Sequence, residues 1–448
     1  MKLFGGQGIR DASCYTVLFL VALLSMVNVS EADNPAIQTI YTADPAPFVY
    51  NGRMYLFADH DEDGSKTFVM KDWRLFSTTD MANWQDHGVV ASLSTFKWAT
   101  GRAWAGQVIN RNNKFYYYLP MQKSSGAMAI GVGVADNVTG PYKDALGKPL
   151  VDNNNIDPTV WINDDGQAYL YYANTGFGYV KLNEDMISIS GGPTSMARPT
   201  ALTEGPWVDK RNGVYYLIYA GNGPTEDIRY ATSSGPVGPW TYKGVIMTAQ
   251  GSSFTNHPGI ADYKNNSYFF YHDGALPGGG GYTRSICVEK FNYNADGTIP
   301  QIKWTTTGPP QIEDLNPYVR QEAETIAFSS GLKTEMSSAG GIHVTSINNG
   351  DYIKVNGVGF GNGTGAANFT ASVASAGNGG KIELHLGSKT GTLIGTCTVP
   401  GTGGAQTWSS VNCPVSNTTG THDLVFLFTG SGSGLLFNFD WWQFTRTS

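Results

Sequence analysis

The sequence predicts an all-β protein, with a five-bladed β-propeller followed by a β-sandwich of the jelly-roll type. Glycine accounts for 56 of the 448 residues, aromatic residues for 12% and charged residues for 15%. Many turns and aromatic residues with few charges are typical of β-proteins. The second observation is a pattern of strand, tight turn and strand that recurs five times between residues 44 and 273.

Each copy of this repeat starts with an apolar strand, continues through a polar turn and ends in a strand rich in tyrosine or phenylalanine. The five copies read APFVYNGRMYLFA, GQVINRNNKFYYYL, PTVWINDDGQAYLYY, PWVDKRNGVYYLIYA and GIADYKNNSYFFYH. Their turns predict β-hairpins centred near Asn51, Asn112, Asp164, Arg211 and Asn265. A period of roughly 50 residues indicates propeller blades, because a single hairpin buries its apolar face only by stacking around an axis. A β-sandwich is the alternative for this region, but it does not explain the long period.

The chain divides into three predicted parts. Residues 1–32 form a secretory signal peptide, residues 33–315 the propeller and residues 316–448 the β-sandwich. Pro309 and Pro310 mark the linker between the last two parts. After the linker, short alternating strands are separated by Gly, Ser and Thr turns, which is typical of a sandwich with its own core.

The signal peptide is predicted from its charge and its apolar stretch. A positively charged start precedes the apolar residues from Tyr15 to Val27, and Ser30 and Ala32 have the small-residue spacing of a cleavage site. A membrane anchor is the alternative, but the stretch is short for a membrane span. We therefore expect a secreted, extracellular protein that is free of the membrane after cleavage. Five N-x-S/T sequons fit a secreted glycoprotein; they begin at Asn137, Asn265, Asn362, Asn368 and Asn417.

The cysteines suggest one disulfide bond. Cys14 lies in the signal peptide, whereas Cys397 and Cys413 flank two predicted strands that are joined by a Gly-rich turn. A cross-strand disulfide between these two residues is plausible in an oxidising compartment. Cys287 is then left unpaired in an apolar strand, where we expect it to act as a small buried hydrophobic residue.

Three acidic residues stand at equivalent positions of the repeat, at the starts of predicted inner strands. Asp44 in TADPAPF, Asp157 in NIDPTVW and Glu204 in LTEGPWV each precede the apolar strand of a blade, and a proline follows within two residues. Because the inner strands of a propeller surround its axis, these acids should meet at one end of the channel. Glycoside hydrolysis needs a protonated acid together with a second carboxylate, and a third carboxylate nearby raises the pKa of the acid. Capping of a turn is the alternative role for any one of these acids.

Other polar or aromatic residues occupy the starts of the remaining inner strands. Blade two offers Trp104 and Gln107 in WAGQV, and blade five offers His257 in NHPGI. We expect Trp104 and Gln107 to contact a sugar, because sugars present apolar C–H faces and hydroxyls. His257 is either a structural histidine or one linked through water or calcium to the axis. Arg284, in RSICVE, is expected to hold Asp157 or a sugar hydroxyl, with a surface position as the alternative.

At these motifs the chain resembles glycoside hydrolase family 43, over residues 33–315. The resemblance rests on IYTADPAPFVYNGRMYLF, WAGQV, NIDPTVW, LTEGPWV, NHPGI and RSICVE. It implies a five-bladed propeller and inversion at the anomeric carbon. It also implies that Asp44 is the general base, Glu204 the general acid and Asp157 the residue that modulates the pKa of the acid. His257 falls where the family often has a histidine tied to an axial calcium ion.

Within the family, the runs ADHDEDGS and KDWRLFSTTDMANWQDHG resemble arabinoxylan arabinofuranohydrolases. This resemblance implies release of α-L-arabinofuranosyl side groups from arabinoxylan, a plant cell-wall polysaccharide. A β-xylosidase or endo-arabinanase of the same fold is the alternative among enzymes, and a non-catalytic, lectin-like propeller is the alternative from another class. The net charge of −7 and the absence of a basic run argue against nucleic-acid binding. We expect a monomer.

The tail resembles carbohydrate-binding module family 6. QEAE and NFDWWQF match the opening and closing motifs of that family. The resemblance implies a structural calcium ion held by Glu322, Glu324 and Asp440, which supply the oxygen ligands that calcium requires.

The usual binding cleft of that module family is altered in this sequence. Two aromatic residues normally sandwich a sugar there, whereas this chain has Ser346 and Ala405 at the corresponding positions and retains Asn438. We therefore expect weak sugar binding at this cleft, with the module acting as a scaffold or through another surface.

Overall fold

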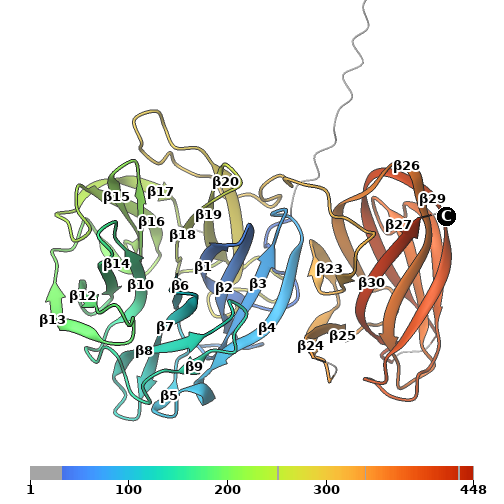
Figure 1. Ribbon diagram of the computed structural model, residues 1–448, viewed down its shortest axis with the longest axis horizontal. Helices are drawn as coiled ribbons and strands as arrows, with labels where there is room; N and C mark the ends of the chain where they lie inside the picture. The colour runs from blue at the N-terminus through green and yellow to red at the C-terminus, as the bar shows by residue number, and fades with distance from the viewer. Residues whose placement is uncertain (1–32, 250–251, 339, 432–433, 447–448) are drawn as a thin grey trace, which may run out of the picture.

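The computed structural model describes residues 33–249, 252–338, 340–431 and 434–446. The predicted signal peptide lies outside these residues. Figure 1 shows the described chain as a propeller, in blue to yellow, beside a sandwich in orange and red. The all-β prediction is therefore confirmed, since the described part contains thirty strands and one 3-10 helix, η1 (Leu93–Thr95). No helix within this part is long and apolar enough to cross a membrane.

Five antiparallel sheets form the blades of the propeller. The first blade contains β1 (Thr42–Tyr50), β2 (Arg53–Asp61), β3 (Met70–Thr78) and β4 (Trp84–Ser92). The second contains β5 (Ala99–Gly101), β6 (Gln107–Arg111), β7 (Lys114–Lys123), β8 (Met128–Ala135) and β9 (Lys143–Asp144). The third contains β10 (Ile156–Ile162), β11 (Ala168–Ala173), β12 (Gly178–Leu182) and β13 (Ile189–Ser195). The fourth contains β14 (Leu202–Arg211), β15 (Val214–Gly221), β16 (Asp227–Ser233) and β17 (Thr241–Met247), and the fifth contains β18 (Gly259–Tyr263), β19 (Asn266–Asp273) and β20 (Ser285–Phe291).

The five predicted hairpins are the inner hairpins of the five blades. In the first blade, Tyr50 pairs with Arg53 across the turn. Asn51 and Gly52 in this turn have φ angles of 47° and 73°. A two-residue hairpin turn of this kind requires positive φ at both positions, which Asn and Gly tolerate best.

Aromatic side chains from the second strand of each hairpin fill the space between blades. Phe57 of the first blade and Tyr117 of the second, both fully buried, meet edge to face with ring centroids 5.1 Å apart. Trp73 contacts Tyr117 in the same way at 6.2 Å. This packing holds the inner strands at fixed positions around the axis, where their first residues form the site.

The three-stranded fifth blade is extended by the N-terminal segment of the described chain. The backbone N–H of Ala36 donates to the carbonyl of Ile286 at 2.8 Å, and the side chain of Asn34 accepts from the N–H of Val288 at 3.0 Å. The edge of β20 is therefore covered, and the first described residues lie next to the last blade.

The C-terminal module is a nine-stranded sheet folded into two layers around an apolar core. Its strands are β21 (Gln321–Glu322), β23 (Phe328–Ser330), β24 (Lys333–Met336), β25 (Ile342–Thr345), β26 (Tyr352–Ala374), β27 (Gly380–Leu386), β28 (Thr392–Val399), β29 (Ser409–Thr429) and β30 (Asn438–Arg446). The predicted disulfide joins Cys397 on β28 to Cys413 on β29, and Cys287 is free and buried. Both cysteine predictions are confirmed.

The propeller and the module share a sheet at their contact. Strand β22 (Thr325–Ile326), which follows the predicted linker, pairs with β4 and becomes the fifth strand of the first blade. Nearby, Asn83 Nδ2 donates to the carbonyl of Asn356 at 2.9 Å, and the N–H of Asn356 donates to Asn83 Oδ1 at 2.8 Å. Both asparagines are buried, so backbone pairing and buried polar contacts hold the module against the propeller.

Candidate active site

The inner strands of three blades begin with the same irregularity. The strand pairing shifts register between Ala43 and Ala46, between Ile156 and Thr159, and between Glu204 and Trp207. Within these β-bulges, Asp44, Asp157 and Gly205 have φ angles of 52°, 53° and 58°. A left-handed backbone is unfavourable for an aspartate, and such strain is concentrated at functional sites.

This alignment corrects one part of the sequence analysis. Asp44 and Asp157 occupy equivalent positions, but Glu204 stands one residue earlier in its blade, and Gly205 takes the left-handed position. A Cβ atom on Gly205 would lie 3.1 Å from His257 Nδ1. Glycine therefore leaves room for the histidine, and the longer side chain of Glu204 reaches the site from the preceding residue.

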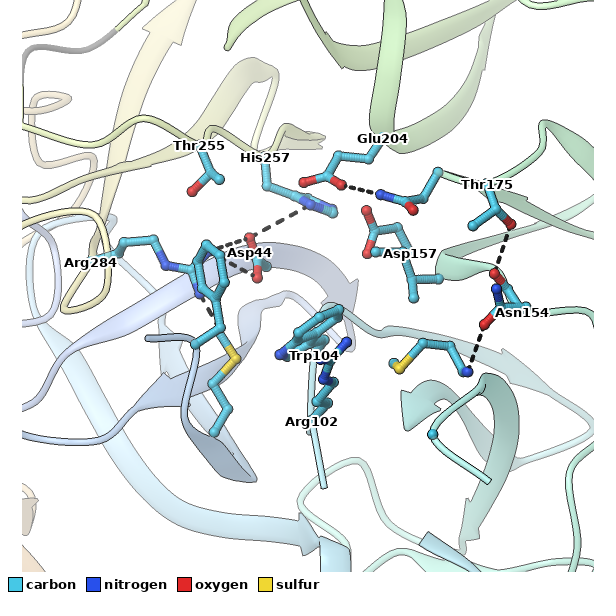
Figure 2. A pocket seen from close by; sticks show the side chains of 16 residues that line it. Asp44, Arg102, Trp104, Asn154, Asp157, Thr175, Glu204, Thr255, His257 and Arg284 are labelled. Atoms are coloured by element: carbon cyan, nitrogen blue, oxygen red, sulfur yellow. Dashed lines mark hydrogen bonds and ion pairs between the residues drawn. The ribbon is translucent and has the colours of Figure 1, made fainter. Parts of the chain in front are cut away.

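The three predicted acids line one pocket of about 330 Å³. In Figure 2 the carboxyl groups of Asp44, Asp157 and Glu204 surround a common space, and Trp104 lies across from His257. Phe68, Met70, Met128 and Ile156 supply apolar wall, and Asn154, Asn174, Thr175 and Thr255 supply polar wall. The pocket thus combines buried carboxyl groups with the apolar and polar surfaces that a sugar ring requires.

Asp44 is held by a buried cation. Arg284 Nη1 lies 3.2 Å from Asp44 Oδ1, while Nε and Nη2 of the same guanidinium each donate to a different oxygen of Asp61 at 2.9 Å. Burial alone raises the pKa of Asp44, but Arg284, His257 and His272 more than offset it and hold this pKa well below its ordinary value. Asp44 is therefore ionised, as a base must be.

Two histidines face the carboxylate of Asp44. Nδ1 of His257 lies 3.6 Å and Nδ1 of His272 lies 3.3 Å from Asp44 Oδ1. Burial lowers the pKa of both histidines, that of His272 to about 3. Nδ1 of the neutral His272 accepts the backbone N–H of Asp44 at 3.2 Å, and its Nε2 lies 3.0 Å from the carbonyl of Thr255. His272 therefore helps to hold Asp44 in its strained conformation.

Asp157 and Glu204 have the opposite electrostatic character. Burial, followed by repulsion from Glu204 and Asp44, raises the pKa of Asp157 well above its ordinary value. Burial also raises the pKa of Glu204, against the lowering effect of a hydrogen bond from Asn174. Asp157 Oδ2 accepts the N–H of Gly205 at 2.9 Å, which fixes it beside Glu204. The coupled pair retains a proton to higher pH than separate acids would.

A fourth acid lies behind this pair. Glu226 is buried, and its Oε2 accepts the backbone N–H of Asn256 at 2.9 Å. Burial and the nearby Glu204 raise the pKa of Glu226 to about 9. Glu226 is therefore neutral near pH 7 and adds no negative charge to the pocket.

The structure places the predicted sugar-contacting residues unequally. Trp104 lines the pocket, and the guanidinium of Arg102 lies 4.8 Å from the centroid of its ring. Gln107 does not line the pocket; its Oε1 accepts the backbone N–H of Val160 at 2.9 Å and so joins blades two and three. Gln107 therefore lies outside the pocket lining with its acceptor used by a buried strand, and its sugar contact stays a prediction.

The predicted partner of Arg284 is also corrected. Arg284 lines the pocket and is buried, but its carboxylate partners are Asp44 and Asp61 and not Asp157. Asp61 lies at the end of β2, where its backbone pairs with Met70. It is one of several acids in the run DHDEDGS, and nothing in that run distinguishes it as the partner of Arg284.

The predicted metal ligands do not form compact clusters. Across the described residues, the trio whose ligand atoms all lie within 4.8 Å of one another is His60, Glu62 and Asp72; neither His257 nor the three acids of the module form such a trio. His60 and Asp72 pair with each other, and Lys71 pairs with Glu62. The geometry around His257 shows one carboxylate neighbour, Asp44 Oδ1 at 3.6 Å from Nδ1.

The module acids nevertheless fit a cation. Glu324 is 3% exposed, and its buried Oε2 has no hydrogen-bond partner. Arg320, which is half exposed, contacts Glu322 Oε2 at 2.8 Å and lies 3.9 Å from Asp440 Oδ2. An unpaired buried carboxylate oxygen beside two further acids is a suitable calcium donor set.

The side chain of Asn438 makes a hydrogen bond within the module. Its Nδ2 donates to the carbonyl of Ala405 at 2.8 Å, and the residue is 7% exposed. Ser346, the other position where the sequence lacks the expected aromatic residue, has a φ angle of 61°. The amide that the cleft would use on a sugar is thus engaged by the loop that lacks the aromatic residue.

Several residues of the site have little signal in a single sequence. His272, Asn174 and Asp61 lie at strand ends or in the loop after a strand, in segments that resemble many others. His272 could have been found only by noting a histidine inside an otherwise apolar strand, FFYHD.

Comparison with known proteins agrees with this arrangement. Residues 32–299 match the model of glycosyl hydrolases family 43, and residues 322–446 match that of carbohydrate binding module family 6. The chain is 39% identical to the arabinoxylan arabinofuranohydrolase of Bacillus subtilis (strain 168), over 92% of each chain.

Solved structures give the same result. The chain is similar to the crystal structure of a family 43 arabinoxylan arabinofuranohydrolase from Bacillus subtilis in complex with cellotetraose. The TM-score is 0.82 and the identity 36%, with 93% of this chain and 99% of the other covered. A family 43 β-xylosidase/α-arabinofuranosidase from a compost metagenome, solved with xylotriose, has a TM-score of 0.57 and 30% identity, covering 63% and 99%. Its description as a calcium-free form implies calcium binding within the family. This chain therefore belongs to the glycosyl hydrolases of family 43 and is a glycoside hydrolase with a carbohydrate-binding module of family 6.

Proposed function

We propose that the protein releases α-L-arabinofuranosyl side groups from arabinoxylan with inversion at the anomeric carbon. The observation that carries the proposal is the electrostatic contrast within one pocket. Asp44 is held ionised by Arg284, while Asp157 and Glu204 share a raised affinity for protons. Hydrolysis of a glycosidic bond by inversion requires one carboxylate base and one carboxylic acid.

The proposed roles follow from this contrast. Glu204 donates its proton to the glycosidic oxygen as the bond to the anomeric carbon breaks. Asp44 accepts a proton from a water molecule, whose oxygen forms the new bond to that carbon. Asp157, fixed by the N–H of Gly205, keeps negative charge or a shared proton beside Glu204 and so maintains its acidic form. The proton lost by Glu204 is recovered from solvent.

The substrate is proposed from the relatives and from the shape of the site. The relative from Bacillus subtilis that matches over both domains is named for arabinoxylan. A pocket of about 330 Å³ suits a single terminal sugar better than the interior of a long chain. This supports removal of a side group over the endo-arabinanase alternative, while a β-xylosidase remains the second candidate because it too acts on a terminal pentose.

The substrate test uses three sugars in parallel. We expect free arabinose from wheat arabinoxylan, and little product from linear arabinan or xylobiose. Proton NMR of the first-formed arabinose should show the β-anomer, since inversion converts the α-linkage. Xylose as the main product would favour the β-xylosidase, and the α-anomer would overturn the role of Asp44 as base. A catalytically inactive chain that still binds these sugars would support a lectin.

We also propose that the protein is secreted and that its partner is plant cell-wall polysaccharide. The charged start and apolar stretch of residues 1–32 support secretion. The family 6 module supports attachment to polysaccharide. Calcium is proposed to bind Glu322, Glu324 and Asp440, for which the unpartnered oxygen of Glu324 is the support; when bound, it would stabilise the module. Mass spectrometry of the N-terminus of the exported protein tests the cleavage after Ala32.

A further inference from the structure

The loop that follows β11 supplies a hydrogen-bond donor to the proposed acid. Asn174 lines the pocket, and its Nδ2 donates to Glu204 Oε2 at 2.7 Å. The dashed line at Glu204 in Figure 2 marks this contact. Asn174 comes from the third blade and Glu204 from the fourth, so the interaction spans two blades at the rim of the pocket.

The position of Asn174 is maintained by an unusual backbone and by a nearby arginine. Its φ angle is 113°, a conformation that residues other than glycine rarely adopt. Arg198 Nη2 donates to the carbonyl of Asn174 at 2.6 Å, and Nη1 lies 3.5 Å from the carbonyl of Leu202. Leu202 begins the strand that carries Glu204, so one guanidinium ties the loop to that strand.

The residues after Asn174 are also anchored. Thr175 Oγ1 donates to the carbonyl of Asn154 at 2.7 Å, and the N–H of Gly176 donates to Asn155 Oδ1 at 2.7 Å. A loop that is held on both sides of a strained residue fixes the direction of that residue's side chain. The contact with Glu204 is therefore built into the loop.

A donor on one oxygen of a carboxylic acid favours protonation of the other oxygen. The carbonyl oxygen of a carboxylic acid is a stronger hydrogen-bond acceptor than the hydroxyl oxygen, so the amide of Asn174 favours the acidic form of Glu204 in which Oε2 is the carbonyl oxygen. The acidic proton then resides on Oε1, the oxygen left for the substrate. We propose that Asn174 is a positioning residue that directs the proton of Glu204 toward the leaving oxygen. This inference rests on the proposed role of Glu204 as general acid.

The alternative is that Asn174 contacts the substrate, since its side chain is exposed in the pocket. A sugar contact contributes to binding whatever the leaving group, whereas a residue that directs a proton matters only when the leaving group needs one. The two roles therefore differ in how the effect of a substitution depends on the leaving group.

The test compares Asn174→Ala and the isosteric Asn174→Asp on arabinoxylan and on 4-nitrophenyl α-L-arabinofuranoside. We expect kcat on arabinoxylan to fall about 10- to 100-fold with KM little changed, because the acid is misdirected. Asn174→Asp should be the more damaging variant, since its carboxylate repels Glu204. On the nitrophenyl substrate, kcat should fall less than about twofold, because nitrophenolate leaves without a proton.

Asn183→Ala is the matched control, because Asn183 donates to Ser188 in an exposed turn of the same blade. It should leave both activities unchanged, and melting curves check that all variants fold. Equal losses on the two substrates, or a rise in KM alone, would overturn the inference. Glu204→Ala is measured alongside: if it too loses both activities equally, the role of Glu204 is wrong, whereas a normal acid signature there confines the failure to Asn174.

Discussion

The chain contains two groups of three acids, and they differ in how their charge is compensated. Asp44, Asp157 and Glu204 come from three blades and meet in one pocket. Glu322 and Asp440 lie on the paired strands β21 and β30, Glu324 lies just after β21, and all three face the contact of the module with the propeller. The first group is compensated by Arg284, which is 3% exposed, and the second by Arg320, which is 52% exposed.

The comparison teaches that partners and burial decide what a carboxylate can do. In the pocket, one acid has a fixed buried cation and the other two have neutral donors, Gly205 N–H and the Asn174 amide. Their proton affinities therefore move apart, which is the condition for acid–base catalysis. In the module, the acids face the long, exposed side chain of Arg320. A metal ion can replace this side chain, which suits a structural site.

The largest expected effect is on catalysis. Glu204→Ala should reduce kcat on arabinoxylan by about 10²–10⁴-fold, since general acid catalysis contributes that much. The loss on the nitrophenyl substrate should be far smaller. The matched change in the module, Glu322→Ala, should leave kcat within twofold, as measured by release of arabinose. A comparable loss in both variants would contradict the division between the two groups.

The next effect is on stability. Arg284→Met leaves the buried Asp61 and Asp44 without a cation and should lower the free energy of unfolding by about 3–5 kcal/mol. Arg211→Met, which removes an exposed pair with Asp262, should cost less than about 1 kcal/mol. Denaturation by urea measures both. Similar values for the two variants would show that the buried network is not what stabilises this end of the propeller.

The ion pair of Arg284 with Asp44 predicts how stability depends on pH. Burial is outweighed by Arg284 and the histidines, so the pKa of folded Asp44 lies below its unfolded value of about 4. Its contribution to stability is therefore complete above that pH and is lost as the pH falls toward the lowered pKa. Arg284→Met should reduce this loss, which thermal unfolding between pH 5 and the acid limit of folding would reveal.

A smaller effect is expected from calcium. Chelation should lower the melting temperature, because a ligand at 100 times its Kd stabilises the folded state by about 2.7 kcal/mol. Glu324→Gln should remove most of this response, since it replaces the buried carboxylate. Calorimetry with and without excess chelator decides it. An unchanged melting temperature in the unmodified protein would exclude a calcium ion at the module acids.

The smallest effect is expected for Arg320, the exposed counterpart of the buried Arg284. Arg320→Met should change stability in the absence of calcium by less than about 1 kcal/mol, as expected for an exposed ion pair. It should also raise calcium affinity several-fold, because the competing guanidinium is gone. Arg446→Met is the control, because it also removes an arginine of the module, but one that lies over the ring of Tyr318. Titration calorimetry would contradict the prediction if Arg320→Met weakened calcium binding.

The sequence was sufficient for the architecture, because hairpin turns and strand alternation are local signals. Asn51 and Gly52 predict their own turn, and the repetition of such turns predicts blades. Asp44, Asp157 and Glu204 could be identified because they recur near the start of the same repeated element. Trp104 and the cysteine pair followed from similarly local patterns.

Contacts between blades were decided only by the tertiary structure. Gln107 resembles a pocket residue in sequence but accepts a hydrogen bond from the backbone N–H of Val160 in the next blade. Arg284 contacts Asp44 and Asp61, and Asn174 reaches Glu204, across separations of 240, 223 and 30 residues. The sequence by itself determined which elements form and which acids stand at their starts. The partners that set the charge and direction of those acids depend on how the blades pack around the axis, and no local pattern encodes that packing.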